Sequence, residues 1–198
     1  MIVRVSCKQL MVGALALLVF GVPARAEPAA DPLGPLLKSR TDSLCYRRDY
    51  DASHLASHPG QVTERILLSF RQDAVRIELR LKDRKPRYMV ATCAWAEHAG
   101  RDVQNKRLIA AFKNDSGFDC IVMVAPSSAE EGGYALIDPA PDGRMLKLFI
   151  DDAVTVRDSL DKNARTAMLN LGREDRVFQL TRTSGAVCKP MEDALEGP

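Results

Sequence analysis

The chain has 198 residues, of which 46% are hydrophobic and 27% are charged, and its formal net charge is +2. This composition excludes a disordered polypeptide, a coiled coil and a collagen-like repeat, and the small net charge argues against a nucleic-acid-binding protein. One globular domain is the expected organisation.

The first 26 residues have the pattern of a signal peptide. A basic start with Arg4 and Lys8 precedes an apolar run over residues 10–22, and Ala24-Arg25-Ala26 follows. This run is shorter than the roughly 20 residues of a membrane-spanning helix. We therefore expect cleavage after Ala26, a location in the periplasm or outside the cell, and no transmembrane segment in the mature chain.

Cleavage changes the charge and the cysteine count. It removes three basic residues, no acidic residue and Cys7, so the net charge falls from +2 to −1 and four of the five cysteines remain. An even number of cysteines in an exported chain indicates two disulfides, although four cysteines permit three pairings. The cysteines form no Cys-x-x-Cys pair, which argues against a zinc site.

The mature chain reads as a series of short strands between two flexible ends. Residues 27–43 are expected to form a flexible leader and residues 189–198 a flexible tail, because both are interrupted by proline and glycine. The domain between them covers residues 44–188. Its clearest element is a hairpin of residues 62–70 and 74–82, in which apolar residues alternate with charged ones in the second strand.

Turn residues separate further strands, which are predicted over residues 87–95, 120–125, 134–137, 146–150 and 176–182. A short helix is predicted near residues 159–171, where Leu160, Ala164, Ala167, Met168 and Leu171 recur at helical spacing. The sequence thus predicts a mainly β protein, a small antiparallel barrel or sandwich of about seven or eight strands.

Two of the possible cysteine pairs fit this arrangement well. Cys93 ends one predicted strand and Cys120 begins another, so a bond between them would close the polar segment in between. Cys45 and Cys188 lie at the two ends of the domain, and the first and last strands of a closed barrel are neighbours. We expect the pairs Cys45–Cys188 and Cys93–Cys120.

The segment from Cys45 to Asp51 is a candidate recognition strip, because it combines aromatic, basic and acidic residues. Arg47 or Arg48 could hold an anionic group, with Tyr46 or Tyr50 supplying contact area. The same residues also fit an edge strand whose arginines pair with neighbouring aspartates. Tyr46, Arg48 and Tyr50 are kept as candidate binding residues.

His54 and His58 have the spacing that would place two imidazoles on one metal if both were helical. Pro59 disfavours a helical conformation at His58, and no glutamate stands beside His54 to act as a base. We predict no metal site, and both histidines are expected to form hydrogen bonds at a turn while remaining candidate binding residues.

Enzyme signatures are not found in the chain. It has no Gly-x-Ser-x-Gly elbow and no glycine-rich phosphate loop, and its paired cysteines leave no thiolate. No catalytic residue and no cofactor is predicted.

Two segments carry a resemblance to other proteins. The first is Cys45-Tyr46-x-Arg48-x-Tyr50-Asp51-x-x-His54-Leu55-x-x-His58-Pro59-x-Gln61, and the second is Arg176-Val177-Phe178-Gln179-Leu180-x-Arg182 before Cys188. Together they resemble a group of small exported proteobacterial proteins of uncharacterised function. The middle of the chain departs from that group. The resemblance implies export and disulfides but no reaction.

The function expected from the sequence is that of an exported, periplasmic, non-enzymatic binding or interaction protein. Its partner would be a periplasmic protein or a small ligand, and nucleic acid is not expected. The alternatives are a hydrolase or other enzyme whose site the sequence does not reveal, and a structural protein of the cell envelope. A small-ligand binder would need an interior cavity, lined by the inward faces of Leu68, Phe70, Ile77 and Leu79. A protein binder would have a filled core and an exposed patch.

Overall fold

The computed structural model of the chain describes residues 30–38, 43–82, 85–97, 99–100, 106–112, 116–124, 130–161 and 163–194. The predicted signal peptide lies outside these residues. Strands β2 (Thr63–Arg71) and β3 (Ala74–Leu81) form the hairpin that the sequence predicts. Their antiparallel register places Leu68 opposite Ile77, so the alternating apolar side chains of both strands lie on one face.

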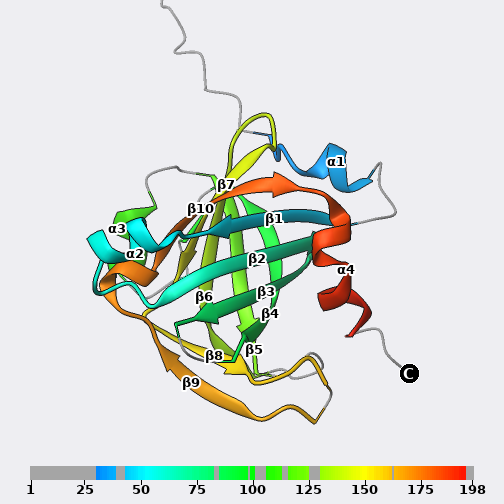
Figure 1. Ribbon diagram of the computed structural model, residues 1–198. Helices are drawn as coiled ribbons and strands as arrows, with labels where there is room; N and C mark the ends of the chain where they lie inside the picture. The colour runs from blue at the N-terminus through cyan, green and yellow to red at the C-terminus, as the bar shows by residue number, and fades with distance from the viewer. Residues whose placement is uncertain are drawn as a thin grey trace, which may run out of the picture.

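Eight antiparallel strands form a closed barrel (Figure 1). The order around the barrel is β3-β2-β1-β10-β7-β6-β5-β4, and the sheet closes where β3 pairs with β4. The other six strands are β1 (Leu44–Asp49), β4 (Arg87–Ala96), β5 (Gly117–Met123), β6 (Glu131–Pro139), β7 (Met145–Ile150) and β10 (Val177–Thr183). The five further segments predicted as strands coincide with β4, β5, β6, β7 and β10, which confirms the small antiparallel barrel.

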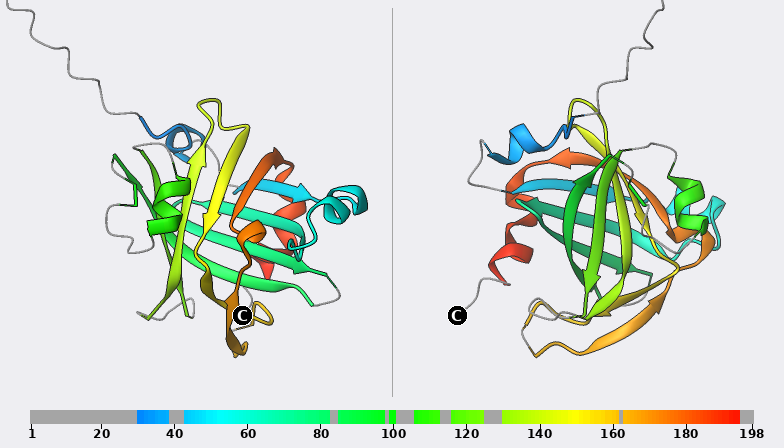
Figure 2. Two further views of the ribbon diagram at one scale, coloured as in Figure 1. Left: turned by 90° about the vertical axis from the view of Figure 1, so that its left-hand side faces the viewer. Right: turned by 180° about the vertical axis from the view of Figure 1, so that it is seen from behind.

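Two more strands, β8 (Ala153–Arg157) and β9 (Thr166–Asn170), form a hairpin that extends the sheet beyond β4. Figure 2 shows this hairpin at the lower border of the barrel. The helix predicted near residues 159–171 is therefore wrong. The residues at helical spacing face different surroundings, since Leu160 is buried and Met168 is 60% exposed, and they do not form one helical face.

Short helices lie outside the barrel: α1 (Gly34–Lys38), α2 (Ala52–Ser57), α3 (Lys106–Ala111), the 3-10 helix η1 (Arg173–Asp175) and α4 (Gly185–Asp193). Within the described residues, no helix is long and apolar enough to cross a membrane.

Parts of the two expected end segments form helices. The leader contains α1, and Leu33 just before it is fully buried in the main core. Leu36 of α1 lies against the β6–β7 turn, where a Cβ added to Gly143 would come within 2.7 Å of its side chain. At the other end, α4 continues to Asp193 because Met191 is buried against the outer face of the barrel. Buried apolar side chains hold the described parts of both segments against the barrel.

Apolar side chains fill the barrel interior. Leu68, Phe70, Ile77 and Leu79 belong to one hydrophobic cluster and are each at most 1% exposed. None of these four residues lines the three principal surface pockets of the described residues. The interior at these positions is a packed core, as the protein-binding hypothesis requires, and not the cavity that a small-ligand binder would need.

Both expected disulfides are confirmed. Cys93 of β4 and Cys120 of β5 are directly opposite in the ladder and bonded to each other. Cys45 of β1 is bonded to Cys188. Cys188 lies in α4, which follows the last strand and turns back over β1 and β2, so the bond joins the two ends of the domain (Figure 1).

Candidate functional site

The candidate site lies at the end of strand β1, where the strand loses one of its two neighbours. The ladder with β10 ends at Arg47, whereas the ladder with β2 continues through Asp49. Arg48 and Tyr50 therefore stand beside a gap in the sheet between β1 and β10. The next residues form α2, which lies over the same end of the barrel (Figure 2).

The two ends of helix α2 are set by Asp51 at its start and by Pro59 after its end. The Asp51 side chain caps the first turn by accepting a hydrogen bond from the His54 backbone N–H at 2.7 Å. His58 ends the helix with φ −126° and ψ 72°, a non-helical conformation that the following Pro59 imposes. This confirms the conformation predicted for His58. The two histidines nonetheless remain one turn apart and close together.

Four side chains form a stacked column along this end of the barrel, namely Arg48, Tyr50, His54 and His58. The Arg48 guanidinium carbon lies 5.0 Å from the centre of the Tyr50 ring, a cation–π distance. The Tyr50 and His54 ring centres are 4.7 Å apart, and those of His54 and His58 are 4.2 Å apart with nearly parallel planes. Four of the five candidate binding residues are thus in contact with one another.

Hydrogen bonds fix the histidine part of the column. Nε2 of His54 lies 3.0 Å from Oε1 of Gln61, and the Gln61 amide nitrogen donates to the Thr63 carbonyl at 2.9 Å. Nδ1 of His58 lies 3.0 Å from the His54 carbonyl. As expected from the sequence, both histidines form hydrogen bonds at a turn, and Gln61 anchors them to the start of β2.

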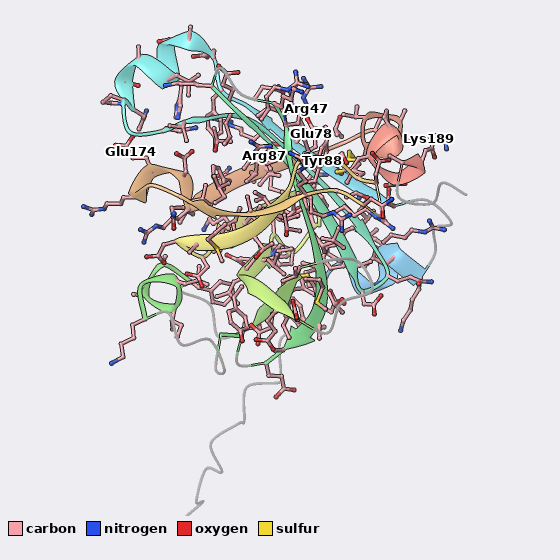
Figure 3. All side chains as sticks on the ribbon, turned by 90° about the horizontal axis from the view of Figure 1, so that it is seen from below. Arg47, Glu78, Arg87, Tyr88, Glu174 and Lys189 are labelled. Carbon is pink, nitrogen blue, oxygen red and sulfur yellow. A yellow bond between two sulfur atoms is a disulfide. The ribbon has the colours of Figure 1, made fainter. Side chains whose placement is uncertain are left out.

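The opposite wall comes from η1, more than 110 residues further along the chain. Asp175 is fully buried, and its two carboxylate oxygens accept hydrogen bonds from the backbone N–H groups of Val62 and Thr63, at 2.8 and 2.9 Å. Glu174 is exposed and lies against Gly60, where an added Cβ would come 3.2 Å from the carboxylate carbon. Figure 3 shows Glu174 beside the loop that follows α2.

These walls enclose an open pocket of about 420 Å³. It is lined by Arg48, Tyr50, His54, His58, Gln61, Glu174, Val177 and Gln179. Val177 is 45% exposed, and Val62, which precedes β2 and is held by Asp175, is 41% exposed. The pocket therefore combines polar and charged groups with exposed apolar side chains at its border.

Arg47 and Arg48 differ sharply although they are adjacent. Arg47 donates to both carboxylate oxygens of Asp49, and Arg65 also donates to Asp49, at 2.7 Å. Partial burial opposes ionisation of Asp49, but its hydrogen bonds to the two arginines lower its pKa. Arg48 forms no ion pair with any residue that the structure describes and rests on Tyr50, whose pKa is raised by burial against the opposing Arg48 charge. Among the described residues that line the pocket, Arg48 is the arginine, and its contacts are with Tyr50 and not with a carboxylate.

Tyr46, the fifth candidate, lies elsewhere. Its side chain is fully buried in the core, and its hydroxyl donates to the Gly143 carbonyl at 2.9 Å. Burial raises the pKa of Tyr46 to about 12, against the lowering effect of Arg182. Its role is structural, and the structure removes it from the candidate site.

Sequence reasoning did not assign Gln61, Glu174, Val177 or Gln179 to the site. Their only signal was indirect: Gln61, Val177 and Gln179 lie within the two segments that carry the resemblance described above, and those segments form opposite walls of the pocket. Among the described residues, no three His, Cys, Asp or Glu side chains are grouped so that they could hold a metal ion.

Comparison with known proteins adds no relative to this description: no family model, no curated protein and no solved structure matches the chain. The function must therefore be argued from the pocket itself.

Proposed function

We propose that the protein is an exported, non-enzymatic binding protein whose pocket holds an acidic group of a protein partner against Arg48. The observation that supports this proposal most directly is that the Arg48 side chain forms no ion pair with any described residue. Its guanidinium is exposed, stacked on Tyr50 and without an ion pair among the described residues. A guanidinium binds a carboxylate through two parallel hydrogen bonds, and stacking fixes its orientation beforehand.

The packed interior favours a protein partner over a small molecule. The barrel core is filled with side chains, and the pocket at Arg48 is open at the surface. Exposed Val177, which lines the pocket with Arg48, provides apolar contact area, a combination typical of protein–protein interfaces. An acidic side chain or a chain terminus of the partner fits these features.

Export is supported by the signal-peptide pattern and by the cysteines. All four cysteines that follow the predicted cleavage site are paired in disulfides. Disulfides persist in oxidising compartments such as the periplasm and are rare in the cytosol.

The test compares two adjacent arginines. Wild type, Arg48→Ala and Arg47→Ala are immobilised, and proteins captured from a periplasmic extract are quantified by mass spectrometry. We expect a protein that is retained by wild type and by Arg47→Ala but lost with Arg48→Ala. With that protein purified, Arg48→Ala should raise the dissociation constant by about 10- to 100-fold, the effect of one hydrogen-bonded charge pair.

Two outcomes would contradict the proposal. Equal loss of binding in both variants would show that the effect is general surface charge, since Arg47 is already occupied by Asp49. A small molecule found by native mass spectrometry in wild type, and absent from Arg48→Ala, would make the pocket a small-ligand site.

A further inference from the structure

Among the described strands, the sheet order ends at β9 without closing on another strand. The barrel strands close on one another, and the order terminates at β9, whose one ladder within the described part of the chain is with β8. Figures 1 and 2 show β9 as the outermost ribbon on its side of the molecule. A free edge presents unpaired backbone groups to any strand that approaches it.

The hydrogen bonds at both ends of the hairpin identify which backbone groups face outward. The Asp158 N–H donates to the Arg165 carbonyl, and the Leu171 N–H donates to the Asp152 carbonyl. Hydrogen-bonded pairs alternate along an antiparallel ladder, so Ala167 and Leu169 are bonded to β8. The N–H and C=O groups that point away from β8 therefore belong to the other, alternate residues of β9, namely Thr166, Met168 and Asn170.

This edge lacks the features that usually prevent strand addition. The five residues Thr-Ala-Met-Leu-Asn include no charge and no proline, and the ladder with β8 runs without a bulge. Met168, at the centre, is 60% exposed, more than any other large hydrophobic side chain of the described residues. Such an edge is an interaction surface of the β-augmentation type.

We propose that β9 pairs antiparallel with β9 of a second copy of this chain, with Met168 of one copy opposite Met168 of the other. This register places Thr166 opposite Asn170 and brings all three outward-facing residues of each copy into hydrogen-bonded pairs. A shift by one residue would align outward groups with groups already bonded to β8. A shift by two would lose one of the three pairs.

The charged residue that precedes the strand does not face its own counterpart in this register. Arg165, the nearest charged side chain in sequence before β9, would face Leu171 of the second copy and not its Arg165. The two Arg165 side chains would stand about 20 Å apart, six residues along the strand direction and beyond the screening length at physiological salt. Each copy has one such edge, so the pairing has two-fold symmetry and stops at a dimer.

This inference is independent of the proposed function, because no residue of β9 lines the Arg48 pocket. Sedimentation velocity over a wide concentration range should show a monomer converting to a dimer. Backbone hydrogen exchange followed by NMR gives the sharper result. The amides of Thr166, Met168 and Asn170 should become protected as concentration rises, while those of Ala167 and Leu169, already bonded to β8, should not change.

Two variants test the edge directly. Met168→Pro removes an outward N–H without removing a bond to β8 and should abolish the dimer. Met168→Lys keeps the backbone and places two like charges opposite each other, so it should weaken the dimer by about tenfold or more at low salt. Met145→Lys, at a similarly exposed methionine on β7, is the matched control and should dimerise like wild type.

Three results would overturn the inference. The first is a wild type that stays monomeric at the highest concentration. The second is a dimer in which protection does not alternate along β9. The third is dimerisation of Met168→Lys equal to that of Met145→Lys, which also covers the case in which Met168→Pro fails to fold.

Discussion

Strand β1 begins and ends in different surroundings. At its start, Leu44, Cys45 and Tyr46 are buried, and the strand is hydrogen-bonded on both sides and bonded covalently to α4. At its end, Arg48 and Asp49 are exposed, and only β2 remains as a neighbour. Six residues of one strand thus pass from a region that stabilises the barrel to a region exposed to solvent. Substitutions along β1 should separate stability from binding.

The largest loss of stability is expected at the covalent bond of the first region. Replacing Cys45 and Cys188 together by alanine should lower the free energy of unfolding by about 5 kcal/mol, because 143 residues separate them. The same change at Cys93 and Cys120, separated by 27 residues, should cost about 3.5 kcal/mol. Urea denaturation measures both values. A larger loss of stability for the Cys93 and Cys120 variant than for the Cys45 and Cys188 variant would contradict the stabilising role of the start of β1.

Asp175 is an exception to the division between a stabilising region and an exposed region. It lies at the end of the barrel where the candidate site is, and yet it is fully buried. The two oxygens of Asp175 each accept a hydrogen bond from one backbone N–H group, and Asp175→Asn leaves a single oxygen for both donors. We expect this change to lower the free energy of unfolding by about 2 kcal/mol. Glu174→Gln, on the adjacent exposed residue, should cost less than about 0.5 kcal/mol. Thermal and urea unfolding compare the two variants, and equal effects would contradict the structural role of Asp175.

The contribution of Tyr46, at the buried start of β1, can be tested through the pH dependence of the free energy of unfolding. Because burial raises the pKa of Tyr46 to about 12, the folded state favours the neutral phenol. Its contribution is present below the ordinary tyrosine pKa of about 10 and is lost as the pH rises toward 12. Tyr46→Phe should cost about 1 kcal/mol at neutral pH, for the lost bond to Gly143, and should lose less stability than wild type between pH 10 and pH 12. Parallel unfolding curves across that range would refute this.

Arg48 should give the smallest change in stability. Arg48→Ala and Arg47→Ala are both expected to change the free energy of unfolding by less than about 0.5 kcal/mol, since Arg48 is exposed and Arg47 forms a surface ion pair with Asp49. Urea denaturation of the two variants checks this. A large loss for Arg48→Ala would move Arg48 from the binding region into the stabilising one.

The barrel and its crosslinks could be predicted because their signals are local. Alternation in residues 74–82 defines a strand with one buried face, and turn residues separate it from its neighbours. The β8–β9 hairpin was missed because Leu160 and Met168 fit a helical period by coincidence, one being buried under α4 and the other exposed. Strand pairing decides this segment, and pairing is not a local property.

The candidate site divides in the same way. Tyr50, His54 and His58 lie within nine residues, so their closeness in sequence and the effect of Pro59 on His58 locate them. Glu174 and Val177 lie more than 110 residues away and reach the pocket only because β10 closes the barrel beside β1. The sequence also could not separate Tyr46 from Arg48. The two residues face the same side of β1, and they differ because Tyr46 lies within the ladder with β10 whereas Arg48 lies beyond its end.

The bond between Cys45 and Cys188 has a mechanical consequence when the backbone is cut. It turns the domain into a covalent ring of 144 residues, counted from Cys45 to Cys188. One cut anywhere in that ring produces a nicked molecule of unchanged mass apart from one water, in which both fragments stay joined and the barrel strands keep their neighbours. A second cut in the ring, or reduction of the disulfide after the first cut, is needed before any part of the barrel can diffuse away.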